Sequence, residues 1–203
     1  MAERGPKITA VVLAAGRSER MGSNKLLADL AGKPLITHSI EMLLASSVYD
    51  VIVVTGNEDE KIRKALHSLD VAFAHNPKFA EGLSTSLKIG LNAVSLDADG
   101  ALICLGDMPL VEMGTIDRLV SSFDEFSHHT ICVPVCDGVR GNPVLWGRRH
   151  FKALERIEGD QGGKRLMASL AKEIFEVKIE SKGVLLDVDT PSDLQEIKSI
   201  LKP

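Results

Sequence analysis

Short apolar runs alternate with longer segments of helical periodicity from near the start of the chain, and this alternation constrains the fold more than any other feature. The clearest runs cover residues 8–13, 51–55 and 101–105. Runs that are apolar throughout and rich in β-branched residues are typical of strands buried on both faces, and strands that alternate with helices build parallel sheets. The chain is therefore predicted to be an α/β protein with a mostly parallel central sheet.

The segments between these strands carry helix signals. Pro34 suits the first turn of a helix, where its missing N–H costs nothing. Ser84 and Thr190 are expected N-caps, and Pro191 fits the first helical position after Thr190. Helices are expected over 34–46, 58–68, 84–94, 115–123, 148–156, 164–170 and 191–201, and a short strand over 71–74.

The rhythm changes after residue 130. Strands expected over 130–135 and 143–146 are separated by two turn-forming pairs, Asp137-Gly138 and Gly141-Asn142, a spacing closer to a hairpin than to a helical crossover. This predicts an antiparallel element on the parallel sheet, followed by strands over 174–179 and 184–186. Because 203 residues suit one compact domain and no linker or repeat is visible, we expect a single domain over 1–203.

The composition excludes several classes of protein. The formal net charge is -4, without the basic tract that binding to nucleic acid requires. Cys104, Cys132 and Cys136 form an odd set without zinc-ligand spacing and are expected to be reduced. The apolar runs fall far short of the roughly 20 residues that cross a bilayer, and the start does not resemble a signal peptide. We expect a cytoplasmic enzyme with neither nucleic acid nor membrane as a partner.

The loop after the first strand is the strongest functional signal. It is rich in small residues, which allow close approach of the backbone to a ligand, and Arg17, Arg20 and Lys25 add positive charge. Its spacing matches neither the Walker loop nor the dinucleotide-binding fingerprint. The loop therefore predicts a polyphosphate site of another type, and a tight turn with surface cations is the structural alternative.

Carboxylates follow two other expected strands. Asp107 comes directly after the strand over 101–105, where a carboxylate is well placed to hold magnesium, although an Asx-turn into Met108-Pro109 is the alternative. Asp187 and Asp189 follow the last expected strand, and either could instead support the start of the closing helix. Two strand-end carboxylates and a cationic loop together suit metal-assisted attack on phosphorus.

Four motifs, in order and spread over nearly the whole chain, resemble those of the MobA/MocA-like nucleotidyltransferases. They are Val12-Leu13-Ala14-Ala15-Gly16-Arg17-Ser18-Glu19-Arg20-Met21-Gly22 with Lys25, Gly82-Leu83-Ser84-Thr85-Ser86-Leu87, Gly106-Asp107-Met108-Pro109 and Asp187-Val188-Asp189-Thr190-Pro191. The resemblance implies a Rossmann-like, three-layer fold of the nucleotide-diphospho-sugar transferase type. It also implies Mg²⁺-dependent transfer of a nucleotide to molybdopterin, with release of pyrophosphate.

The same resemblance implies a role for each matching residue. Arg17, Lys25 and Asp107 are expected to be catalytic, and Asp107 and Asp189 to bind the magnesium. The expected nucleotide-binding residues are Leu13, Ala14, Ala15, Gly16, Arg17, Ser18, Lys25, Gly82, Ser84, Ser86 and Asp107, and the expected acceptor-binding residues are Asn142, Pro143, Gly162 and Gly163.

The residue at position 15 predicts which nucleotide base the protein binds. Cytidylyltransferases of the family tend to have Leu-Ala-Ala-Gly after the first strand and guanylyltransferases Leu-Ala-Gly-Gly, and here the residue is Ala15. A methyl group at this point would leave no room for a purine, so CTP is the expected substrate. Asn142 departs from the family pattern, which has a His before the Pro, and this leaves the acceptor more open than the nucleotide.

Three alternatives stay open at this point. The chain could be a guanylyltransferase, or it could act on another phosphorylated acceptor, such as a sugar phosphate or a methylerythritol-type phosphate. It could also be a non-catalytic accessory protein that delivers a cofactor. Three ionic residues in one constellation, Lys25, Asp107 and Asp189, favour an enzyme over a mere binder, and its product would pass to a molybdoenzyme.

Overall fold

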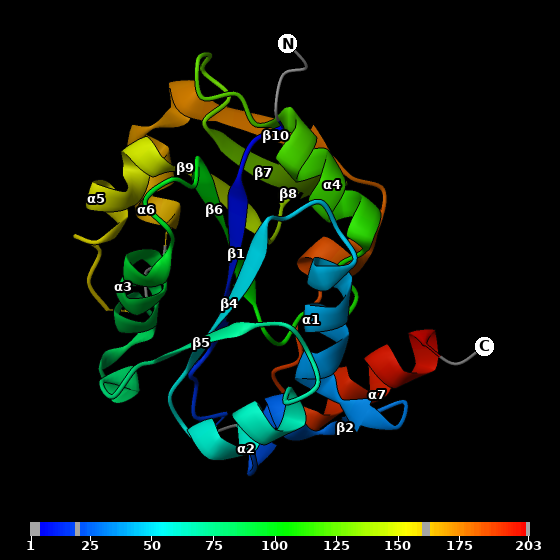
Figure 1. Ribbon diagram of the computed structural model, residues 1–203. Helices are drawn as coiled ribbons and strands as arrows, with labels where there is room; N and C mark the ends of the chain where they lie inside the picture. Colours follow the sequence, from blue (N-terminus) through cyan, green and yellow to red (C-terminus); the bar gives the residue numbers. More distant parts are fainter. Residues whose placement is uncertain (1–4, 19–20, 160–162, 202–203) are drawn as a thin grey trace.

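A twisted sheet forms the middle layer of the structure, a computed structural model that describes residues 5–18, 21–159 and 163–201 (Figure 1). The strands lie in the order β10-β7-β9-β6-β1-β4-β5, and β8 pairs with β7 beside this path. Their bounds are β1 Ile8–Ala14, β4 Asp50–Thr55, β5 Ala72–His75, β6 Gly100–Leu105, β7 Ile131–Cys136, β8 Val139–Arg140, β9 Val144–Gly147 and β10 Ile174–Lys178. Strands β2 (Asp29–Leu30) and β3 (Lys33–Pro34) form a separate ribbon.

Helices cover both faces of the sheet (Figure 1). The α-helices are α1 Leu35–Leu44, α2 Asp59–Ala65, α3 Leu83–Ala93, α4 Met113–Ser122, α5 Phe151–Leu154, α6 Lys164–Ser169 and α7 Pro191–Ile200, and the 3₁₀ helices are η2 Lys25–Leu27, η3 Phe79–Glu81, η4 Arg148–His150, η5 Ala171–Glu173 and η6 Lys182–Leu185. Helices α1 and α4 lie on one face and α3, α5 and α6 on the other. None of the described helices combines the length and the apolar character needed to span a membrane.

Strand β1 explains why there are two apolar layers. All of its residues are buried, because β4 and β6 flank it in parallel register and helices cover it above and below. Successive side chains of a strand point to opposite faces. Accordingly Val12 packs in the layer with α1 and α4, whereas Val11 and Leu13 pack in the layer with α3. The predicted α/β class with a mostly parallel sheet is confirmed.

The predicted antiparallel element is also confirmed, with one strand more than expected. Strand β9 runs antiparallel to both β6 and β7, and β8 runs antiparallel to β7. The β7–β8 turn contains Asp137 and Gly138, both with positive φ, 51° and 79°. Asp-Gly pairs favour this geometry, which matches the twist of hairpin strands.

Two local expectations are wrong. Of the strand expected over 184–186, Val184 and Leu185 instead end the 3₁₀ helix η6 and only Leu186 is extended, because the side chain of Ser181 caps a 3₁₀ turn by accepting from the N–H of Gly183. Helix α3 begins one residue early and has Gly82, not Ser84, at its N-cap, where φ is 108°. By contrast, Thr190 caps α7 as expected, in a reciprocal capping box with Asp193.

Candidate active site

A cleft of about 810 Å³ opens beyond the carboxyl ends of β1 and β6. Ligands of open α/β sheets collect at this edge, where loops and helix starts converge. Many of the residues predicted for the site line the cleft, namely Leu13, Ala15, Gly16, Arg17, Ser18, Lys25, Gly82, Ser86, Asp107 and Asp189. Two nucleotide-binding candidates do not: Ala14 is packed in the core, and the side chain of Ser84 is buried within α3.

Lys25 lies between two of the predicted carboxylates. Its Nζ is 2.5 Å from Asp107 Oδ2 and 2.7 Å from Asp189 Oδ1. These residues come from η2, from the turn after β6 and from the segment before α7. The fold therefore brings together three side chains that are far apart along the chain.

The loop after β1 holds Lys25 in place. Ser18 has a left-handed backbone, with φ 55°, and its Oγ accepts a hydrogen bond of 3.1 Å from the backbone N–H of Lys25. Asn24 caps η2, with its Oδ1 accepting from the N–H of Leu26 at 3.1 Å. The loop therefore closes on itself ahead of the lysine. Arg20, the third predicted cation, lies outside the described residues.

The backbone fixes the two carboxylates relative to each other. The N–H of Val188 donates a hydrogen bond of 3.0 Å to the carbonyl of Asp107. Val188 itself is fully buried. On the other side, the carboxylate of Asp193 accepts from the N–H of Asp189 at 2.9 Å, so the α7 capping box also holds the second carboxylate.

Burial shapes the charges of the site. The side chains of Lys25 and Asp107 are each only 15% exposed. Burial raises the pKa of Asp107 above its usual range, and the Lys25 ammonium opposes this without cancelling it. Burial alone would lower the pKa of Lys25, but its interactions with Asp107 and Asp189 outweigh burial, so its pKa is raised. Lys25 therefore stays protonated beside a carboxylate that is poorly solvated.

The acidic groups fit a hard divalent cation. Ligand oxygens of Asp107, Asp187 and Asp189 all lie within 4.8 Å of one another. Within the described part of the chain, no group donates a hydrogen bond to Asp107 Oδ1, which is buried. Buried carboxylate oxygens normally have a partner, and Mg²⁺ and Mn²⁺ prefer oxygen ligands. Asp107 Oδ1 is therefore available to bind a divalent cation together with the other carboxylates of the cluster.

Asp187 was not selected as a ligand from the sequence. The available signal was its spacing of two from Asp189, because residues two apart in an extended segment point to the same side. The intervening Val188 points into the core accordingly.

One wall of the cleft also escaped the sequence analysis. Phe79, Glu81 and Leu83, from η3 and the start of α3, line it beside the first loop. The guanidinium of Arg17 lies 5.7 Å from the centre of the Phe79 ring. An aromatic residue in an irregular loop gives no periodic signal, so the sequence did not single it out.

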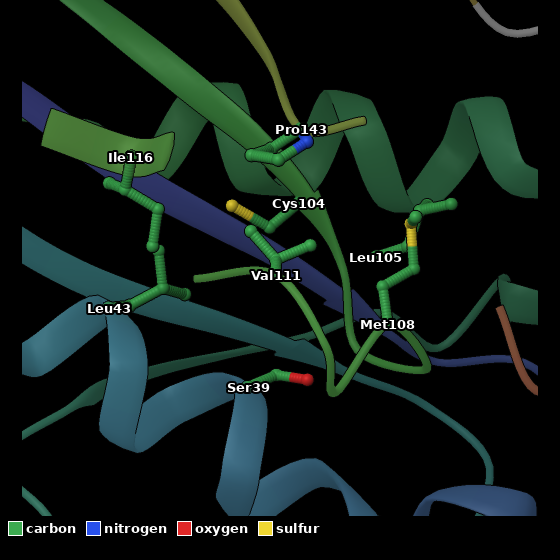
Figure 2. A pocket seen from close by; sticks show the side chains of 8 residues that line it. All are labelled: Ser39, Leu43, Cys104, Leu105, Met108, Val111, Ile116 and Pro143. Carbon is green, nitrogen blue, oxygen red and sulfur yellow. The ribbon is translucent and has the colours of Figure 1, made fainter. Parts of the chain in front are cut away.

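The described acceptor candidates, Asn142, Pro143 and Gly163, are not among the residues that line this cleft. Pro143, which follows a cis peptide bond, borders a separate apolar cavity of about 20 Å³ instead (Figure 2). That volume has room for about one water molecule and not for a substrate. Gly163 lies against the ring of Trp146, and Gly162 lies outside the described residues. The structure therefore leaves their assignment to the acceptor as a prediction.

The chain is similar over nearly its whole length to known proteins. Residues 10–174 match the family model of the MobA-like NTP transferase domain. The chain is 29% identical to the "Purine catabolism protein PucB" of Bacillus subtilis (96% of this chain, 98% of the relative). It is 26% identical to the "Molybdenum cofactor cytidylyltransferase" of Escherichia coli (92% and 93%), and 32% identical to the "Probable molybdenum cofactor guanylyltransferase" of Thermococcus sibiricus (95% and 98%).

Solved structures share the fold over almost their whole length. A nucleotidyl transferase from Methanothermobacter (Mth528) superposes with a TM-score of 0.84 at 26% identity, covering 97% of this chain and 98% of its own. Rv0371c of Mycobacterium tuberculosis in complex with manganese superposes with a TM-score of 0.82 at 26% identity, covering 95% and 98%. The predicted Rossmann-like fold of the nucleotide-diphospho-sugar transferase type is confirmed, and the chain belongs to the MobA-like NTP transferase family of nucleotidyltransferases.

Proposed function

We propose that this protein is a cytoplasmic, Mg²⁺-dependent enzyme that transfers CMP from CTP to molybdopterin or the molybdenum cofactor and releases pyrophosphate. The observation that carries this proposal is the position of Lys25, in contact with both Asp107 and Asp189 inside the cleft. Lys25, at the end of the small-residue loop, could bind the phosphates of a triphosphate, and the two carboxylates beside it could bind the metal ion that accompanies it. The product would pass to a molybdoenzyme.

Asp107 and Asp189 would hold the Mg²⁺, with Asp187 close enough to join them. The unpartnered Oδ1 of Asp107 and the manganese complex of the related Rv0371c support this assignment. When bound, the cation would neutralise charge on the phosphates and help to align them.

The chain's own residues would do the remaining work. When the triphosphate binds, Lys25 would replace one of its contacts with a carboxylate by a contact with a phosphate. Its charge would then stabilise the negative charge that builds up as the acceptor attacks. Arg17, at the mouth of the same loop, would bind the outer phosphates. A phosphate oxygen of the acceptor would form the new bond to the α-phosphorus while the bond to the bridging oxygen of the β-phosphate breaks, and pyrophosphate would leave with that electron pair.

The choice of CTP rests on Ala15. Its methyl group and the Cβ of Phe79 both lie against Gly56, each closer than 3.0 Å to where a Cβ on that glycine would stand. Ala15 and Phe79 both line the cleft, so we expect the methyl group of Ala15 to narrow the space for a base. We expect Ala15→Gly to improve the use of GTP relative to CTP.

A guanylyltransferase is the second candidate, because the Thermococcus sibiricus relative, named for the guanylyl reaction, is 32% identical over 95% of this chain. Both candidates use the same phosphates and metal, so the geometry of Lys25 and the carboxylates does not separate them. The base alone does.

The test is a pyrophosphate-release assay with purified protein, Mg²⁺, each of the four triphosphates, and molybdopterin with or without molybdenum. We expect release with CTP only when the acceptor is present. Equal rates with GTP would overturn the base assignment. Turnover with a sugar phosphate or methylerythritol-type phosphate in place of the pterin would overturn the acceptor, and no turnover under any condition would favour a non-catalytic delivery protein.

A further inference from the structure

We infer that Gly183 is a positioning residue for the paired-carboxylate site, acting through the backbone segment that carries Asp187 and Asp189. The inference rests on the proposed function, in which those carboxylates hold a cation. Gly183 lies in η6 and is not among the residues that line the cleft. Its role follows from how closely it lets two backbones approach.

The contact of Gly183 with the turn after β6 is unusually tight. A Cβ on Gly183 would stand 2.0 Å from the carbonyl oxygen of Leu110 and 2.6 Å from its carbonyl carbon. Ordinary contacts begin at 3.4 Å, and the atoms in the way belong to backbone, which cannot rotate aside as a side-chain tip could. Any side chain at this position would therefore drive η6 away from Leu110.

Leu110 and Asp107 belong to the same turn, which links Gly183 to the site. Five residues after Gly183, the N–H of Val188 donates to the carbonyl of Asp107 at 3.0 Å. The segment is thus held against the turn at two points, a close approach at Gly183 and a hydrogen bond at Val188. Asp187 and Asp189 flank the second point.

A second glycine, Gly141, also lies close against this segment. A Cβ on Gly141 would stand 2.2 Å from the carbonyl oxygen of Val184, and the N–H of Asn142 donates to that oxygen at 2.9 Å. Val184, the residue after Gly183, is therefore also held in place by backbone contacts. Between these contacts the segment has little freedom to shift without moving Asp189 away from Lys25.

The spacing of the ionic groups makes such a shift matter. Asp189 Oδ1 lies 2.7 Å from Lys25 Nζ, and a displacement of about 1 Å in a reacting constellation can cost about 100-fold in rate. Gly183→Ala should therefore weaken the cation site while leaving every ionic side chain in the protein.

The experiment compares Gly183→Ala with two alanine controls. Gly100→Ala introduces a similar backbone clash, 2.7 Å from the carbonyl oxygen of Trp146, at the opposite edge of the sheet. Gly114→Ala, in α4, has nothing within 4 Å of the new Cβ. Three quantities are measured for each protein: the melting temperature, the affinity for Mn²⁺ alone by electron paramagnetic resonance, and the hydrogen-exchange rate of the Val188 amide relative to amides of β1.

We expect Gly183→Ala to lose Mn²⁺ affinity by about 10- to 100-fold, the range typical of groups that orient metal ligands, and to lose exchange protection selectively at Val188. Gly100→Ala should lose melting temperature alone, and Gly114→Ala should match the wild type. If Gly183→Ala is not obtained folded, Gly141→Ala, which crowds the same segment, is carried through the same measurements.

Unchanged Mn²⁺ affinity and unchanged relative protection at Val188 in Gly183→Ala, with a melting loss like that of Gly100→Ala, would overturn the inference. Failure of the proposed function looks different, because the wild type itself would then neither bind Mn²⁺ nor release pyrophosphate. The exchange of Val188 would still report whether Gly183 positions the segment.

Discussion

Three polar side chains from distant segments meet at each of the two edges of the sheet. The two clusters differ in burial and in how fully their hydrogen bonds are satisfied. At the carboxyl edge, Lys25, Asp107 and Asp189 meet in an open cleft, and one buried oxygen of Asp107 lacks a hydrogen-bond donor in the described chain. At the opposite edge, Thr130 and His150 are buried and Glu173 is only partly exposed.

The second cluster is closed by its own hydrogen bonds. Thr130 donates to Glu173 Oε2 at 2.9 Å, and its oxygen lies 2.9 Å from His150 Nε2. Because the hydroxyl proton goes to Glu173, His150 Nε2 carries the proton that it donates to Thr130. The cluster ties together the start of β7 and the turns η4 and η5.

The comparison separates a structural polar cluster from a functional one. Satisfied buried polar groups rigidify the fold, whereas an unsatisfied group costs free energy and persists where a ligand can complete it. We expect changes at the carboxyl edge to affect turnover and changes at the opposite edge to affect stability. A substitution at the carboxyl edge that affected only stability, or one at the opposite edge that affected only turnover, would contradict this division.

The largest effect is expected for Asp107→Asn. Turnover should fall by about 100- to 1000-fold, the cost of removing one group that stabilises charge in the transition state. The melting temperature should hold, because the change removes a buried carboxylate with an unsatisfied oxygen while Lys25 keeps Asp189 as its ionic partner. Steady-state pyrophosphate release and thermal unfolding measure the two, with Asp70→Asn at an exposed site as control. A collapse in melting temperature with normal activity per folded molecule would make Asp107 structural.

Lys25→Met should separate metal binding from turnover. Without the ammonium, three carboxylates with oxygens within 4.8 Å lose their countercharge, so Mn²⁺ alone should raise the melting temperature more than in the wild type. Turnover should nevertheless fall by about 100-fold, because the triphosphate loses its cation. The matched control is Lys33→Met, which removes an exposed ion pair with Glu41. Weaker stabilisation by Mn²⁺ in Lys25→Met would contradict the account.

Much of the carboxyl edge could be predicted because it depends on local signals. Small residues after a strand, a carboxylate at a strand end and Thr-Pro at a helix start can each be recognised from a few neighbouring residues, and parallel strands place their ends together. The rest depends on tertiary contacts. Residues 184–186 look like a strand, yet the first two end the 3₁₀ helix η6, whose Gly183 packs closely against the backbone of Leu110. Phe79 lies in a short 3₁₀ turn that gives no periodic signal, and Thr130, His150 and Glu173 are too far apart along the chain to form a sequence pattern.

Thr130→Val should produce the reverse of Asp107→Asn. The change removes a buried hydroxyl that forms hydrogen bonds with both His150 Nε2 and Glu173 Oε2, so the free energy of unfolding should fall by about 1–3 kcal/mol. Activity per folded molecule should be unchanged. Urea denaturation measures the loss, and Ser121→Ala, which removes an exposed hydroxyl bonded to the Arg118 carbonyl, should change stability by less than about 0.5 kcal/mol. Loss of turnover at full stability would show that the opposite edge also serves the reaction.

The smallest effect is a pH dependence that comes from His150. Burial lowers its pKa, the charge of Arg149 adds to this, and Glu173 opposes it. Below the ordinary histidine pKa of about 6.5 the unfolded chain then binds more protons than the native one, so stability falls as the pH decreases, by at most about 1.4 kcal/mol per pH unit.

Denaturation midpoints between pH 7.5 and 5.5 test this dependence. His150→Gln should have a shallower acid slope than the wild type, and His67→Gln, at an exposed site, should keep the wild-type slope. Equal slopes for the wild type and His150→Gln would rule out His150 as the source.

The most direct test of the central claim is a crystal structure with Mn²⁺ and a non-hydrolysable CTP analogue. We expect anomalous scattering from Mn²⁺ between Asp107 and Asp189, the triphosphate along the loop after β1, and Lys25 in contact with a phosphate. Manganese and triphosphate bound elsewhere, with Lys25 still between its two carboxylates, would contradict the account.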